Sequence, residues 1–141
     1  MKDLELLQYV HETAAMGVEG LQDISQSIHN GALMQAVQAQ VAEYSAIAQN
    51  SGELLHARGE QPKDPSLLAR ISSEVMSTVE TLADSSTSKI AELVIRGNTM
   101  GVTKGIKHLH DYEGDDRKVR ALAEQLLEAE EKNIAQMKPF L

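Results

Sequence analysis

Residues 3–31, DLELLQYVHETAAMGVEGLQDISQSIHNG, decide the fold of this chain. From Leu4 to Ile28 their apolar side chains recur at intervals of three and four residues, which is the spacing of one helical face. The stretch ends in a short polar segment, in which Gly31 suits the left-handed conformation that follows many helices. We therefore predict a helix over residues 3–28 that ends in a tight turn.

The remainder of the chain repeats this pattern. Apolar stripes with helical spacing predict three further long helices over residues 32–58, 86–113 and 116–138. The segment Gly114-Asp115 is expected to end the third of the long helices and to cap the fourth. The sequence thus predicts an all-α fold with a single domain over residues 1–141.

A shorter amphipathic segment over residues 66–83 separates the second and third long helices. Helices of about 26 residues run about 39 Å at about 1.5 Å per residue, and a helical segment with extended ends could return along that length. Such a crossover would make the second and third long helices parallel. The alternative is a five-helix up-and-down bundle in which residues 66–83 are a full member.

The composition excludes several classes of chemistry. The 141 residues include no Cys, which excludes disulfides, thiolate metal sites and Cys nucleophiles. A formal charge of −8, three Tyr, one Phe and no Trp disfavour binding to nucleic acid. Neither an export signal nor a membrane span is recognisable, so we expect a cytoplasmic protein without a membrane partner. Neither a nucleophile motif nor a phosphate-binding loop is present, and we expect no enzymatic activity.

The stretch LLEAEEKNI over residues 126–134 resembles the last helix of ferritin-like proteins, and the predicted architecture is similar to that superfamily over nearly the whole chain. Members with two irons place a Glu on each of two helices and a Glu-x-x-His on each of the other two. The matching segments are EYSA over residues 43–46 and EEKN over residues 130–133, and both lack the imidazole. The resemblance, which is to small bacterial members, implies a ferritin-like four-helix bundle with a degenerate iron site.

The expected register brings four polar residues to one height in the bundle. If the long helices pair as predicted, this layer consists of Glu19, Glu43, Asn98 and Glu130. Asn98 and Glu130 belong to apolar faces and are expected to point inward, whereas Glu19 lies on the most polar face of its helix.

Two interpretations of this layer remain open. Asn98, Glu130 and Asn133 can form a hydrogen-bonded layer that fixes the helix register, because buried polar groups require partners. Alternatively, carboxylates of Glu19, Glu43 and Glu130 can bind iron. His11 lies on the apolar seam of its helix and is expected to be a hydrogen-bonded core histidine near Asn50, Ser51 and Glu124.

Three glycines are spaced four residues apart on the third long helix: Gly97, Gly101 and Gly105. Each costs a helix about 1 kcal/mol relative to Ala, so their common face needs a compensating contact. Internal packing, a subunit interface or a groove for a flat ligand can each supply one. The sequence therefore predicts a helix-contact face without fixing what it contacts.

Taken together, these features favour a non-catalytic ferritin-like bundle that works through self-assembly or through an unidentified protein partner. A homo-oligomer without a cofactor is expected. The alternative is a carboxylate-rich iron-binding protein with oxygen or peroxide chemistry, with Glu19, Glu43 and Glu130 as the metal ligands.

Overall fold

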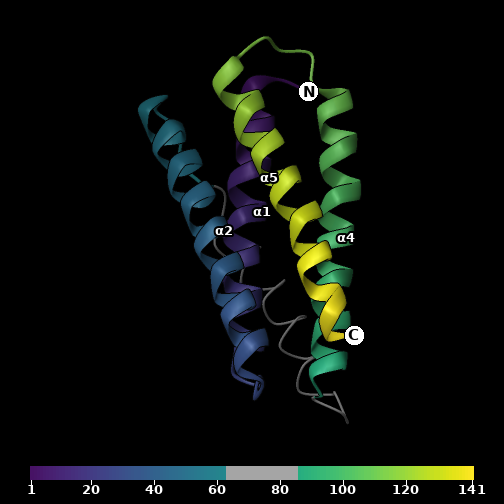
Figure 1. Cartoon of the computed structure of the whole chain (residues 1–141). Coiled ribbons are helices and arrows are strands. Elements are labelled where there is room, and N and C mark those ends of the chain that lie inside the picture. Colours follow the sequence, from purple (N-terminus) through teal and green to yellow (C-terminus); the bar gives the residue numbers. More distant parts are fainter. Residues whose placement is uncertain (63–85) are drawn as a thin grey trace.

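The chain is an all-α four-helix bundle (Figure 1), and the computed structural model describes residues 1–62 and 86–141. The elements are α1 (Asp3–Ser25), α2 (Gly31–Ala57), α4 (Thr87–Asp111), α5 (Arg117–Met137) and a short 3₁₀ helix, η1 (Lys138–Phe140). α1 packs mainly on α2, and α4 packs mainly on α5. Within the described ranges, none of the helices has the length and apolar character that a membrane crossing requires.

The directions of α2 and α4 set the arrangement of the two helix pairs. Both run the same way along the bundle (Figure 1), which is the orientation predicted for a bundle with a long crossover. The end of α2 and the beginning of α4 therefore lie at opposite ends of the molecule. The predicted crossover helix over residues 66–83 lies outside the described residues.

The turn between α1 and α2 differs from its prediction. α1 ends at Ser25, three residues earlier than expected, and Asn30 caps α2 by accepting a hydrogen bond from the Leu33 N–H at 2.9 Å. The prediction of a left-handed Gly31 is wrong, because Gly31 is the first helical residue of α2. Among the described residues, the glycine with a positive φ is Gly59, at 73°, just after α2.

The cap of α5 also lies one residue beyond its predicted place. Asp116, and not Asp115, is the N-cap, and its Oδ1 accepts hydrogen bonds from the N–H groups of Lys118 at 3.0 Å and Val119 at 3.2 Å. Its other carboxylate oxygen pairs with Arg58, just after the end of α2. Asp116 thus begins one helix and joins it to the end of another.

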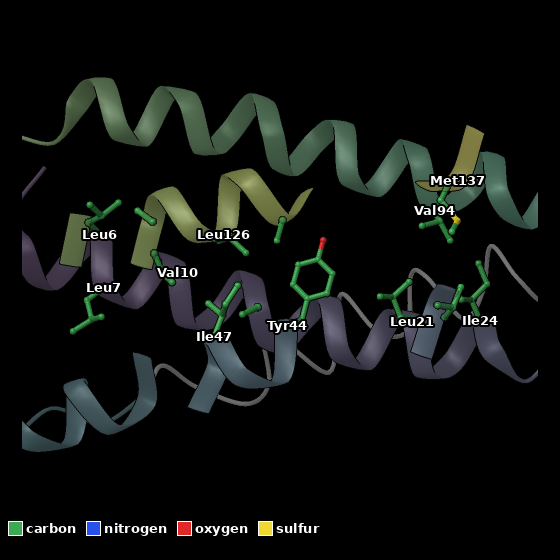
Figure 2. Close-up of a cluster of buried hydrophobic side chains, with 14 of the residues drawn as sticks. Leu6, Leu7, Val10, Leu21, Ile24, Tyr44, Ile47, Val94, Leu126 and Met137 are labelled. Atoms are coloured by element: carbon green, nitrogen blue, oxygen red, sulfur yellow. The ribbon is translucent and has the colours of Figure 1, made fainter. Parts of the chain in front are cut away.

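The apolar core is divided along the bundle axis. Figure 2 shows Tyr44 between two groups of buried apolar side chains, with its hydroxyl pointing toward α4. The first group includes Leu6, Val10, Ile47 and Leu126, and the second includes Leu21, Ile24, Val94 and Met137. Burying one such side chain contributes about 1.5–3 kcal/mol. The two groups hold the helices together and leave a polar layer between them.

Candidate functional site

Polar side chains from three helices form a buried polar layer between the two apolar groups. They are Gln40 and Tyr44 of α2, Asn98 of α4, and Glu130 and Asn133 of α5. None of these residues is more than 5% exposed. The Tyr44 hydroxyl donates a hydrogen bond to Asn98 Oδ1 at 3.1 Å. This bond joins α2 to α4 across the centre of the bundle.

Glycines on the neighbouring helices make room for the bulkier members of the layer. A Cβ at Gly17 of α1 would lie 2.9 Å from the Tyr44 ring. A Cβ at Gly101 of α4 would overlap the carboxyl group of Glu130. Asn98 and Gly101 are three residues apart and therefore lie on the same face of α4. The local sequence of α4 thus supplies both an amide partner for Tyr44 and space for Glu130.

Burial controls the charge of the layer. Desolvation raises the pKa of Glu130 to about 8, so its carboxyl is mostly protonated at pH 7. Burial, followed by the nearby Glu130 charge, raises the pKa of Tyr9 of α1 to about 12. The same two causes raise the pKa of Tyr44 well above its usual range. The layer is therefore largely uncharged at neutral pH.

Several polar atoms of the layer make no hydrogen bond within the described part of the chain. They are Nε2 and Oε1 of Gln40, Nδ2 of Asn98, Oε2 of Glu130, and Nδ2 and Oδ1 of Asn133. These groups include both donors and acceptors, and a protonated Glu130 adds a further donor. The layer can therefore hold one proton at Glu130, and the hydrogen bond between its helices in the described ranges is the one from Tyr44 to Asn98.

The three predicted metal ligands do not occupy one environment. Glu130 is buried in the layer, whereas Glu19 of α1 is exposed. Glu43 of α2 is near the same height as Glu130, but its Oε1 accepts a hydrogen bond from Lys132 Nζ at 2.9 Å, and its side chain is 29% exposed. Residues 1–62 and 86–141 contain no group of three or more His, Asp or Glu placed to hold a metal ion.

His11 joins α1 to α2 at another height. Its Nδ1 lies 2.9 Å from the Ala48 carbonyl oxygen and 3.2 Å from Ser51 Oγ. The Ser51 hydroxyl in turn donates to the Ile47 carbonyl at 2.7 Å. This half-buried imidazole is held by backbone and hydroxyl groups of α2.

The three predicted helix-contact glycines have different surroundings. Gly101 faces Glu130, and Gly105 is buried near Leu127 and the Tyr9 hydroxyl, at 3.5 and 3.7 Å from a Cβ placed on it. Gly97 is exposed, and a Cβ placed on it would meet nothing within 4 Å. Gly101 and Gly105 therefore face the interior of the bundle, and Gly97 does not.

Sequence reasoning missed Gln40 and Tyr9 as members of this region. Gln40 continues the buried stripe of α2 at a spacing of three and four residues from Val37 and Tyr44, so helical periodicity could have found it. Tyr9 is held by tertiary contact, because its ring stacks on His108 of α4 with centroids 3.8 Å apart. No signal in the sequence of α1 alone indicates that contact.

The fold and the layer define a small helical bundle with a polar centre. No protein-family model matches the chain, and neither a curated protein nor a solved structure is significantly similar to it.

Proposed function

We propose that this protein is a non-catalytic, ferritin-like helical bundle that acts through self-assembly. The observation that carries the proposal is the outward face of α4. Met100 is 60% exposed and Ile106 is 40% exposed, with the exposed Thr103 midway between them at a spacing of three residues. Contiguous exposed apolar surface marks protein interfaces, and a second copy that covers the outward half of α4 would bury both side chains.

The interior of the bundle supports a structural role for the polar residues. The Tyr44–Asn98 hydrogen bond connects α2 with α4, and the Lys132–Glu43 ion pair connects α5 with α2. The Glu130 carboxyl rests against Gly101 and is mostly protonated at pH 7. These groups fix the positions of helices, as expected for a bundle whose iron-binding identities have been replaced.

Sedimentation equilibrium over a range of protein concentrations tests the proposal. We expect an apparent mass above the 15.4 kDa of one chain that rises with concentration. The double substitution Met100→Gln with Ile106→Gln should shift the protein toward the monomer. Leu141→Gln is the matched control, because Leu141 is an apolar residue, 61% exposed, outside α4. A constant monomer mass for the unmodified protein would contradict self-assembly.

The alternative function is iron binding through Glu19, Glu43 and Glu130, with oxygen or peroxide chemistry. The buried Glu130 carboxyl favours it, but Glu43 would have to leave Lys132 and Glu130 would have to lose its proton. A metal that binds only the native state must raise the melting temperature. We expect anaerobic ferrous iron to leave the melting temperature unchanged. An increase that Glu130→Gln abolishes would favour the iron-binding function instead.

A further inference from the structure

The buried polar layer offers more hydrogen bonds than its own side chains use. Six of its side-chain atoms make no hydrogen bond within the described part of the chain: both polar atoms of Gln40, both of Asn133, Nδ2 of Asn98 and Oε2 of Glu130. Each of these four residues is at most 5% exposed. A buried polar atom without a partner costs free energy, so a molecule that bonds to these atoms stabilises the folded chain.

The residues that carry these atoms lie together at the centre of the bundle. Gln40 lies one helical turn before Tyr44 on α2, and Asn133 lies one turn after Glu130 on α5. The Tyr44 hydroxyl reaches Asn98 of α4 at 3.1 Å, and the Glu130 carboxyl lies against the next turn of the same helix. After burial itself, the charge of Glu130 is the next cause of the raised pKa of Tyr44, as expected for neighbouring groups.

The chemistry of these atoms determines what can bind among them. Each amide supplies both donors and an acceptor, whichever way it is turned, and a protonated Glu130 is a further donor. The N–H donors disfavour a cation, and the carbonyl oxygens disfavour an anion. An apolar molecule would bond to none of these groups. The layer therefore fits a small neutral molecule that both donates and accepts hydrogen bonds, and water has these properties.

We propose that the polar layer is a binding site for water, in which ordered molecules bridge Gln40, Asn98, Glu130 and Asn133. A buried water makes about three hydrogen bonds, so six unpartnered atoms correspond to about two waters. These waters join α2, α4 and α5 through bonds that the side chains do not make directly. They also give the Glu130 carboxyl a neighbour with which it can exchange its proton. The site lies inside one chain, so it stands whether or not chains self-assemble.

Oxygen-17 magnetic relaxation dispersion tests the proposal, because it counts the waters that stay in a protein for longer than the protein takes to tumble. We expect Gln40→Leu with Asn133→Leu to lower this count by about two relative to the unmodified protein. The Leu side chains fill the same region and form no hydrogen bond. An unchanged count would mean that the layer holds no ordered water and would overturn the proposal.

The matched control is Gln38→Leu with Asn50→Leu, which makes the same two replacements at exposed positions of α2. Waters at an exposed side chain exchange rapidly with the solvent, so the count should equal that of the unmodified protein. An equal loss of waters in both double variants would overturn the assignment of the waters to the layer. Circular dichroism checks that both variants keep their helices.

A second measurement uses the unmodified protein and does not depend on whether a variant folds. Nuclear Overhauser effects between water and the side-chain amide protons of Gln40 and Asn133 report water in contact with these groups. We expect such effects, with opposite signs in the laboratory and rotating frames, as long-lived water gives. Their absence would overturn the proposal. The oxygen-17 count does not respond to proton exchange, so it distinguishes bound water from a signal relayed by the Tyr44 or Glu130 hydroxyl proton.

Discussion

Gly97 and Gly101 are one helical turn apart on α4, yet we expect substitution by Ala to stabilise the protein at Gly97 and to destabilise it at Gly101. Ala is better than Gly inside a helix by about 1 kcal/mol. Because a Cβ at Gly97 would meet nothing within 4 Å, Gly97→Ala should raise the free energy of unfolding by up to about 1 kcal/mol. Gly101→Ala must displace the buried Glu130 carboxyl, and we expect a net loss of about 1–3 kcal/mol. Urea denaturation measures both changes.

A double substitution separates the steric effect of Gly101→Ala from other causes. In a Glu130→Ala background the overlapping carboxyl is absent, so Gly101→Ala should become neutral or stabilising relative to that background. An equal loss in both backgrounds would show that Gly101 is needed for a reason other than the room it leaves for Glu130.

The inward residues of the layer were predictable one by one, but their partners were not. The helical period places Asn98, Glu130 and Asn133 on apolar faces, and all three are buried. The pairing of Glu43 with Lys132 depends on how α2 and α5 are rotated about their own axes. Periodicity fixes the face of a residue within its helix, and packing decides which neighbour that face meets.

At the scale of the element, Asp116 is the residue on which the beginning of α5 depends. Asp116→Ala removes hydrogen bonds to the N–H groups of Lys118 and Val119, together with the pair to Arg58. Loss of an N-cap costs about 1–2 kcal/mol, and we expect a fall of that size in the free energy of unfolding. Asp116→Asn should lose less, since its amide oxygen still accepts the capping bonds.

The neighbouring Asp115→Ala provides the comparison for the cap. Asp115 is exposed and is not the N-cap of α5, so its substitution should change stability by less than about 0.5 kcal/mol. Thermal denaturation at neutral pH ranks the three variants. If Asp115→Ala costs as much as Asp116→Ala, the loss arises from net charge and not from capping.

Helix interiors were more predictable than helix ends. The stripes of all four long helices follow from their apolar period, whereas α1 ends three residues early and α5 is capped one residue late. Asn30 begins α2 and Asp116 begins α5 by accepting backbone hydrogen bonds. Adjacent polar residues are alternative N-caps, and the sequence alone does not show which of them the backbone places at the start of the helix.

At the scale of the whole molecule, the order of the helices was predictable because chain length limits the connections. The parallel directions of α2 and α4 follow from two long pairs and one long connection. The stacking of Tyr9 on His108 could not be predicted, since it depends on the height of α1 against α4. Distances between elements that are remote in sequence require the packed structure.

The buried layer should make the stability of the whole bundle depend on pH through Glu130. Its pKa is about 8 in the folded chain and near 4.5 when unfolded, so between these values the folded state holds a proton that the unfolded state has released. The free energy of unfolding should therefore fall as pH rises through this window, by about 1.4 kcal/mol per pH unit from this group.

Glu130→Gln keeps the shape of the side chain but cannot ionise, so the contribution should vanish. Urea denaturation of both proteins from pH 5 to 8 measures the difference, in which the titration of unaffected groups cancels. We expect the free energy of unfolding of the Gln variant to exceed that of the unmodified protein by an amount that grows toward pH 8. If the two free energies change in parallel with pH, the carboxyl is already ionised in the folded state.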